Sequence, residues 1–142
     1  MKNSDRIRLR TGVEVSRLAL GTAAFGGLYS SVTDSDCTAS VACAIDRGIT
    51  FFDTAPHYGK GRAEQRLGSA LRAYPRGSYV LSTKIGRLLT PVDFEADDFF
   101  LDANTNVTRT FDYSARGVRQ SFEESLTRLG LDSIDILFIH DP

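Results

Sequence analysis

The sequence of 142 residues predicts an α/β fold built on parallel strands. Short apolar runs alternate with segments of helical periodicity, and glycine or proline follows the helical segments. A polar residue stands where each apolar run ends. Alternating strands and helices require parallel strands joined by right-handed crossovers. The pattern therefore fits either an open doubly wound sheet or part of a closed (β/α) barrel.

A small hairpin is expected ahead of the alternating elements. The alternating segments 7–10 and 13–15 flank a Thr-Gly pair that suits a tight turn. This hairpin is expected to close the floor of a barrel. The first strand of the main sheet follows at 18–20 and ends at Gly21-Thr22.

The next two βα units carry clear end signals. Residues 33–36 resemble a capping box that opens a helix through Asp46, and Gly48 suits its C-terminus. The apolar run 49–52 is the second strand. A second helix is predicted from apolar residues at helical spacing, namely Leu67, Ala70, Leu71 and Tyr74. Proline and glycine end that helix, and the third strand covers 79–84.

The segment 87–111 is expected to form a long irregular loop. Loops much longer than ~15 residues are usually functional or disordered. Three phenylalanines stand among acidic residues in this segment: Phe94, Phe99 and Phe100. A last helix is predicted over 114–129 from its apolar face, with Gly130 closing it. The fourth strand is expected at 134–139.

Composition excludes several classes of partner. A formal net charge of −1 and the lack of a Lys/Arg block argue against nucleic acid and acidic membranes, so a small-molecule partner is expected. The longest apolar run, near Leu137, is too short to span a bilayer. Residues 1–6 lack the apolar core of a signal peptide, which predicts a cytoplasmic protein. Cys37 and Cys43 fall on different helix faces, so no disulfide between them is expected. Both are expected to be buried free thiols.

Four residues able to handle protons stand at predicted strand ends: Asp53, Tyr58, Lys84 and His140. Reactive groups gather at this rim in parallel α/β folds. A free phenol has a pKa near ~10, so Tyr58 needs a nearby cation; the Lys84 ammonium at roughly 4 Å would stabilise the phenolate by about 4 kcal/mol. Asp53 would hold that ammonium, and His140 would donate a hydrogen bond to a substrate carbonyl. The set suits proton transfer coupled to hydride transfer.

Each of the four residues also has an ordinary structural explanation when it is taken alone. Asp53 would cap a loop and Tyr58 would pack as a loop aromatic. Lys84 would be a solvated strand end, and His140 a hydrogen-bonded core histidine. Their shared position at consecutive strand ends favours the functional interpretation. No metal site is expected, because His57 and His140 lack a paired ligand spacing or a cysteine cluster.

These residues resemble the aldo-keto reductase family along nearly the whole chain. The resemblance rests on Gly21-Thr22, Gly48-Ile-Thr-Phe-Phe-Asp53-Thr-Ala-Pro-His-Tyr58-Gly59, Glu64 with Leu67-Gly68, Ser82-Thr-Lys84, Ser125-Leu-Thr-Arg-Leu-Gly-Leu-Asp132 and Asp135-Ile-Leu-Phe-Ile-His140. It implies a (β/α)8 TIM-barrel fold and a catalytic tetrad consisting of Asp53, Tyr58, Lys84 and His140. In this tetrad Tyr58 is the general acid/base for hydride transfer. The resemblance also implies NADP or NAD as cofactor, contacted by Thr22 and Asp53.

Within the family, three features are most similar to the dehydrogenases of D-threo-aldoses, L-fucose and pyridoxal. They are the Pro-His-Tyr-Gly form, the extended loop after Lys84 and the Ile-His-Asp-Pro sequence. The similarity implies oxidation of a sugar lactol or a ring-bearing alcohol. The phenylalanine-rich loop is then either a substrate lid or a flexible loop.

Four strands are half of the eight that such a barrel needs. Residues 1–142 are therefore expected to form its N-terminal half, with edge strands at 18–20 and 134–139 and an uncovered apolar inner face. Three explanations stay open: a fragment of a longer polypeptide, self-association, or completion by a separate chain. Two alternatives to an active enzyme also stay open, namely a non-catalytic binding or regulatory protein on a barrel scaffold and an inactive fragment without its cofactor-binding half.

Overall fold

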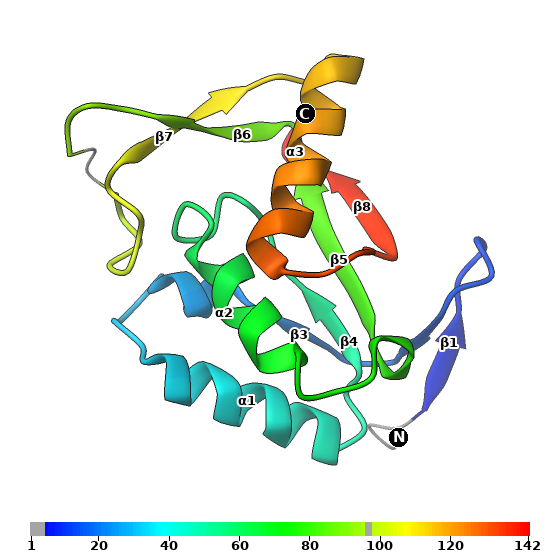
Figure 1. Ribbon diagram of the computed structural model, residues 1–142. Coiled ribbons are helices and arrows are strands. Elements are labelled where there is room, and N and C mark those ends of the chain that lie inside the picture. The colour runs from blue at the N-terminus through cyan, green and yellow to red at the C-terminus, as the bar shows by residue number, and fades with distance from the viewer. Residues whose placement is uncertain (1–4, 96–97) are drawn as a thin grey trace.

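The computed structural model describes residues 5–95 and 98–142 (Figure 1). The start of the chain at 1–4, which entered the signal-peptide argument, lies outside the described residues. The elements follow in the order β1 (Arg6–Arg8), β2 (Glu14–Ser16), β3 (Ala19–Gly21), the 3-10 helix η1 (Ala23–Gly26), α1 (Asp34–Asp46), β4 (Phe51–Asp53), α2 (Arg62–Leu71), η2 (Arg76–Ser78), β5 (Val80–Ile85), β6 (Arg87–Pro91), β7 (Val107–Phe111), α3 (Ala115–Leu129) and β8 (Ile136–Ile139).

The main sheet has four parallel strands in the order β3-β4-β5-β8. Figure 1 shows α1, α2 and α3 on one side of this sheet, with α2 between the other two helices. The buried core lies between the helices and the sheet and contains Phe25, Cys37, Val41, Ala44, Phe52, Ala63, Leu67, Ala70, Leu71, Tyr79, Leu81 and Leu129. The predicted alternation of four parallel strands with three helices is confirmed.

The predicted ends of α1 and α3 are also confirmed, whereas α2 ends at Leu71 and does not reach the predicted Tyr74. The Thr33 hydroxyl accepts a hydrogen bond from the Asp36 amide at 3.1 Å, and the Asp36 carboxylate accepts from the Thr33 amide, which completes the capping box of α1. The Ser114 hydroxyl caps α3 in the same way, by accepting from the Gly117 amide. Gly130 closes α3 in the left-handed conformation at φ 64°.

The segment 87–111 differs from the expected irregular loop. Its two ends form β6 and β7, which pair antiparallel over five residues each and extend beyond the main sheet (Figure 1). The hydroxyls of Thr90 and Thr110 lie 2.8 Å apart across this ladder. Threonine and other β-branched residues favour strands, and β7 contains Val107, Thr108 and Thr110. Among the described residues between the two strands, 92–95 and 98–106 form no helix or strand.

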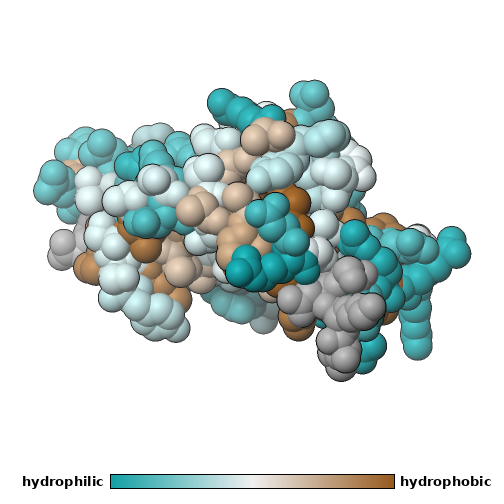
Figure 2. Space-filling model, turned by 90° about the horizontal axis from the view of Figure 1, so that it is seen from below, coloured by the Kyte–Doolittle hydropathy of each residue, from teal (hydrophilic) through white to brown (hydrophobic). Residues whose placement is uncertain are grey.

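Apolar side chains are exposed on and beside the two edge strands of the sheet. β3 and β8 are the two edges of the sheet. Leu18, Leu137, Phe138 and Ile139 expose 46%, 42%, 46% and 59% of their surface. The hairpin β1–β2 lies near the N-terminal ends of the sheet strands. There Leu9 and Val13 line an apolar hollow together with Phe51 and Leu137. Figure 2, a view from below, shows separate apolar patches between polar side chains.

The cysteines correct one expectation. Both thiols are free, and Cys37 is buried as expected, but Cys43 is exposed. Its sulfur lies 2.6 Å from Nη1 of Arg47 on the outer face of α1. Within the described residues, no helix is both long and apolar enough to cross a membrane. The same residues contain no cluster of three His, Cys, Asp or Glu side chains arranged to hold a metal ion.

Candidate active site

The register of the parallel strands brings three of the predicted residues to one rim. Asp53 ends β4 and pairs with Ser82 of β5, while Lys84 of β5 pairs with Phe138 of β8. His140 follows β8 directly. Because all these strands run in the same direction, their C-terminal ends share one side of the sheet.

Lys84 is fixed by two oxygens of the neighbouring strand. Its Nζ lies 2.6 Å from Oδ2 of Asp53 and donates to the Thr54 carbonyl at 2.9 Å. The second carboxylate oxygen, Oδ1 of Asp53, accepts a hydrogen bond from the Ser82 hydroxyl at 2.7 Å. The Lys84 side chain is only 15% exposed. The ammonium is therefore held in one place by an ion pair, as the sequence predicted.

Tyr58 lies on the loop between β4 and α2, next to this ammonium. Nζ of Lys84 is 4.9 Å from the centroid of the Tyr58 ring, and the ring of His140 is 6.1 Å away and nearly perpendicular. The loop is tied back by the Ala63 amide, which donates to the Tyr58 carbonyl. The structure thus brings Asp53, Tyr58, Lys84 and His140 together at the C-terminal ends of the parallel strands. We call this region the mouth.

The His140 imidazole is buried and neutral. The residue is 7% exposed, and burial followed by the charge of Arg87 lowers the pKa of His140 to about 4. Its Nδ1 finds no hydrogen-bond partner among residues 5–95 and 98–142. A neutral imidazole carries one N–H donor, so at neutral pH it can offer a hydrogen bond without carrying charge.

A second imidazole, that of His57, lies at the mouth. Its place in the site was not predicted from the sequence. Its ring meets the rings of His140 and Phe100 edge to face, at 5.4 and 5.5 Å between centroids. Burial, with the charge of Arg109 next, lowers the pKa of His57 to about 4. The only signal in the sequence was its position beside Tyr58, because the residues that surround it come from distant segments.

The connection between β6 and β7 contributes a wall of the mouth. We call its residues 98–106 the hairpin arm. Phe99 and Phe100 stack at 4.5 Å between centroids, and both rings reach His57. Phe100 is buried, whereas Phe99 is 59% exposed. Phe94, the third predicted member of the aromatic group, is 60% exposed and lies before the arm.

Buried charges fasten the hairpin arm to the Tyr58 loop. The carboxylate of Asp98 pairs with Arg109 and lies 3.5 Å from Nζ of Lys60, and the side chains of Asp98 and Lys60 are each 2% exposed. Nη2 of Arg109 also donates to the His57 carbonyl at 2.9 Å. The Asn104 amide adds a hydrogen bond to the Gly59 carbonyl. These contacts make the arm a fixed wall of the site.

Gly26 and Gly59 allow η1 to approach the Tyr58 loop. A Cβ on Gly26 would lie 2.5 Å from the Gly59 amide nitrogen, and Gly59 itself has φ 61°. Side chains at either position would push the two backbones apart. Gly59 belongs to the motif at 53–59, but no local signal in that motif indicates this contact.

Thr22 lies one strand away, next to Asp53. It is completely buried, and both its amide and its hydroxyl donate to the Asp53 carbonyl, at 2.9 and 3.0 Å. Its side chain is thus used to position Asp53 rather than presented at the mouth. The carboxylate of Asp53 remains 27% exposed.

Glu64 links the helices to the strand that carries Lys84. Its carboxylate is completely buried, accepts a hydrogen bond from the Thr83 hydroxyl at 2.8 Å and pairs with Nε of Arg128 at 2.6 Å. α2, α3 and β5 therefore share one polar junction behind the site. Glu64 was part of the motif quoted in the sequence, but its partners were not predictable from spacing alone.

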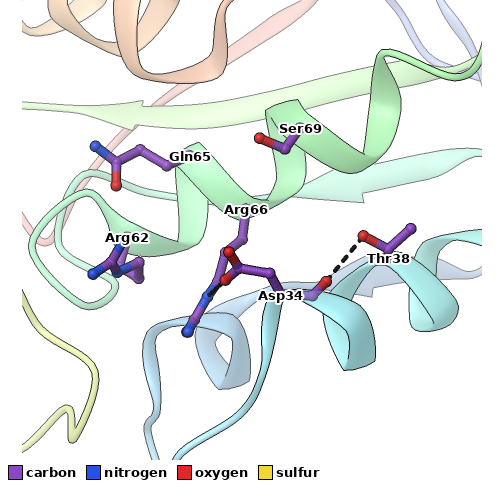
Figure 3. A pocket seen from close by; sticks show the side chains of 6 residues that line it. All are labelled: Asp34, Thr38, Arg62, Gln65, Arg66 and Ser69. Carbon is purple, nitrogen blue, oxygen red and sulfur yellow. Dashed lines mark hydrogen bonds and ion pairs between the residues drawn. The ribbon is translucent and has the colours of Figure 1, made fainter.

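Arg66 joins the hairpin arm to α1. Its guanidinium donates to Asp34 and Asp102, both at 2.8 Å, and to two backbone carbonyls. Figure 3 shows Arg66 reaching Asp34 in a polar pocket between α1 and α2, which is lined by Asp34, Thr38, Arg62, Gln65, Arg66 and Ser69. Burial raises the pKa of Asp102, but hydrogen bonds from Ser31, Val32 and Arg66 outweigh it and lower the value to about 2.

Asp102→Asn is expected to destabilise the fold in a pH-dependent way. A carboxyl with a pKa of about 2 in the folded state and 3.8 when unfolded contributes about 2 kcal/mol above pH 4. Because the folded pKa is the lower one, this contribution is lost as pH falls towards 2. Urea unfolding at pH 7 should show the deficit, and the two proteins should converge near pH 2. The exposed Asp93→Asn serves as control, and an equal deficit at both pH values would contradict the assignment.

Comparison with known proteins gives a consistent result. The model of the aldo/keto reductase family matches residues 17–142. D-threo-aldose 1-dehydrogenase from a Pseudomonas species is 39% identical, over 100% of this chain and 45% of the relative. Pyridoxal 4-dehydrogenase from Microbacterium luteolum is 42% identical, over 99% and 44%. The chain thus spans less than half the length of these curated relatives.

Solved structures agree with the fold. A putative aldo-keto reductase from Pseudomonas aeruginosa has a TM-score of 0.75 and 34% identity, covering 99% of this chain and 47% of that one. An aldo-keto reductase from Bombyx mori, solved in complex with NADP, has a TM-score of 0.68 and 26% identity, covering 100% and 39%. Such neighbours are (β/α)8 barrels, so the four-stranded parallel sheet with its N-terminal hairpin is part of a barrel of this type.

Proposed function

Because the chain belongs to the aldo/keto reductase family, we propose that it supplies the proton-handling side of an NAD(P)-dependent oxidoreductase site. The reaction interconverts an alcohol or lactol with a carbonyl group. The observation that carries the proposal is the Lys84 ammonium, which is paired with Asp53 and lies 4.9 Å from the centroid of the Tyr58 ring. Few structural roles require a fixed cation beside a phenol at the mouth of a parallel sheet.

In this proposal Tyr58 is the general acid and base. As the phenol gives its proton to the substrate oxygen, negative charge develops on the phenolic oxygen, and the Lys84 ammonium stabilises it. Two opposite unit charges roughly 5 Å apart at an effective dielectric near 20 attract each other by about 3 kcal/mol, and the 4.9 Å observed here runs from Nζ to the ring centroid. Asp53 keeps the ammonium in position and balances its charge while no phenolate is present. In the opposite direction Tyr58 accepts the proton of the alcohol.

His140 is assigned to orientation of the substrate. Its imidazole is neutral at pH 7, because the pKa of His140 is lowered to about 4. A neutral N–H can donate to the substrate oxygen and direct it towards Tyr58 without competing as a proton donor. The edge-to-face contact with His57 limits the space in which the imidazole can turn.

The four proposed site residues fit the proton transfer that accompanies hydride transfer to or from a nicotinamide. A bound nicotinamide supplies or accepts the hydride. The exposed part of the Asp53 carboxylate is the group on this chain that we assign to the cofactor side of the mouth. Thr22 contributes through the Asp53 carbonyl that it holds. The assignment covers NADP or NAD equally.

The relatives and the aromatic wall support a substrate class. Dehydrogenases of D-threo-aldoses and of pyridoxal act on ring-bearing substrates, which suggests a sugar-like or pyridoxal-like molecule here. The exposed face of Phe99 and the ring of His57 offer flat surfaces on which such a ring can lie.

The test is hydride transfer by the complete polypeptide that carries this chain. L-fucose or pyridoxal is mixed with NAD or NADP, and the formation of reduced nicotinamide is followed by its absorbance. Turnover with either cofactor is the expected result. Cofactor binding detected by fluorescence, without turnover on any sugar or pyridoxal, would favour the non-catalytic scaffold function instead.

A further inference from the structure

The root of the hairpin β6–β7 touches the segment that carries His140. The Tyr113 hydroxyl, which follows β7, lies 2.6 Å from the His140 carbonyl oxygen and 3.0 Å from that of Asp141. The shorter distance identifies the His140 carbonyl as the main acceptor. β8 has ended at Ile139, so this hydrogen bond reaches the first residue beyond the sheet.

The backbone constrains one side of the Tyr113 ring. The ring packs directly on Gly86, where a Cβ would lie only 2.1 Å from Cε1 of the ring. Gly86 has φ 97°, a conformation that suits glycine, and its carbonyl accepts a hydrogen bond from the Asp112 amide at 3.0 Å. The Phe111 ring lies 6.4 Å away between centroids, and Tyr113 remains 40% exposed. The contact with Gly86 and the hydrogen bonds of the hydroxyl therefore set the position of the ring.

A second contact ties the same segment to the same hairpin root. The guanidinium of Arg87, the first residue of β6, forms an ion pair with Asp141 and lies 5.2 Å above the Phe111 ring. Asp141 adopts φ 46°, a left-handed conformation that is uncommon for residues with a side chain. Both ends of the hairpin thus hold the two residues that follow β8.

We propose that Tyr113 is a positioning residue for His140. The backbone of His140 has one further hold, the hydrogen bond from its amide to the Ile85 carbonyl at 3.0 Å. The amide and the carbonyl belong to the two peptide planes that flank the His140 Cα, so fixing both of them fixes the Cα–Cβ direction from which the imidazole projects. This inference rests on the proposed function, in which the imidazole aims the substrate oxygen.

The charges around the imidazole are consistent with a tightly held ring. The groups that face it are Arg87, Lys84, Asp141, Asp53 and the rings of His57 and Tyr58. The two cations lower the pKa of His140 and the two carboxylates raise it, while burial has the largest effect. Loosening the ring would admit water and weaken that effect.

The kinetic test compares Tyr113→Phe with the wild-type complete polypeptide. The substitution keeps the ring on Gly86 and removes only the hydroxyl. A single hydrogen bond of this kind corresponds to a fall in kcat/KM of about 3- to 10-fold. Tyr74→Phe, the same chemical change at a half-buried ring outside the mouth, is expected to leave kcat/KM unchanged.

A double-mutant cycle separates positioning from general support. If the hydroxyl acts through the imidazole, Tyr113→Phe has no further effect on kcat/KM in a His140→Ala background. Equal losses in both backgrounds would overturn the proposal and indicate a merely structural role.

A titration of His140 by NMR gives a readout without turnover. In Tyr113→Phe the pKa of His140 is expected to rise from about 4 towards its usual value. A shifted titration in a protein that transfers no hydride would support the positioning role while the proposed function fails. An unchanged titration and unchanged kcat/KM would overturn the positioning role while leaving the proposed function intact.

Discussion

Replacing Tyr58 with phenylalanine is expected to lower kcat of the complete polypeptide by about 10²- to 10⁴-fold. The ring would keep its place between Lys84 and His140, so packing and substrate access change little. The lost group is the hydroxyl that gives or takes the substrate proton. Because this group acts in the transition state, KM should change far less than kcat. Steady-state kinetics with saturating nicotinamide measure both quantities.

Tyr29→Phe is the matched control for this substitution. Tyr29 is 87% exposed, and the same loss of a hydroxyl there should leave kcat unaltered. Turnover of Tyr58→Phe close to that of the wild type would remove the phenol from the mechanism. Fluorescence titration of the cofactor should give the same affinity for Tyr58→Phe and wild type, which shows that the variant is folded and lacks only the chemical step.

The second expectation is a loss of stability in mild acid caused by the half-buried imidazole of His57 and the buried imidazole of His140. His57 and His140 each have a folded-state pKa of about 4, compared with 6.5 when unfolded. Since the folded value is the lower one, the unfolded state takes up protons first as pH falls. The full stability is present above pH 6.5 and is lost progressively between pH 6.5 and 4. Each histidine then removes about 3 kcal/mol.

Urea unfolding between pH 7 and 4 measures this loss. The variant His57→Gln/His140→Gln should show a much flatter dependence on pH in this window, whatever its stability at pH 7. The difference in slope between variant and wild type belongs to these two residues, because other titrating groups are common to both proteins. Identical slopes would mean that neither imidazole is held neutral by the fold.

Local sequence signals predicted most of the fold because they act over short distances. The capping box at 33–36 and the glycine after α3 specify helix ends without help from tertiary contacts. β6 and β7 were missed for the opposite reason. Their pairing joins Arg87 to Phe111 across a connection too long for a turn motif, so only three-dimensional contacts reveal it.

Some residues of the candidate site were likewise predictable from the sequence, and others were not. Asp53, Lys84 and His140 were predictable as neighbours because parallel strands in register bring their ends together. His57 and Tyr113 were not, since their neighbours come from segments that are distant in sequence. Thr22 shows a further limit. A motif identifies the residue, but whether its hydroxyl faces a ligand or the adjacent backbone depends on hydrogen bonds that no spacing encodes.

Surface hairpins normally tolerate changes in length, and the hairpin β6–β7 should not. Its arm is fastened to the Tyr58 loop through Asp98 and Arg109, while its root holds His140 through Tyr113. An insertion or deletion between these anchors is expected to shift Tyr58 and His140 together, which are the proposed proton donor and the proposed orienting imidazole. Homologues that differ in the size of this hairpin should therefore differ in catalytic chemistry as well as in substrate range.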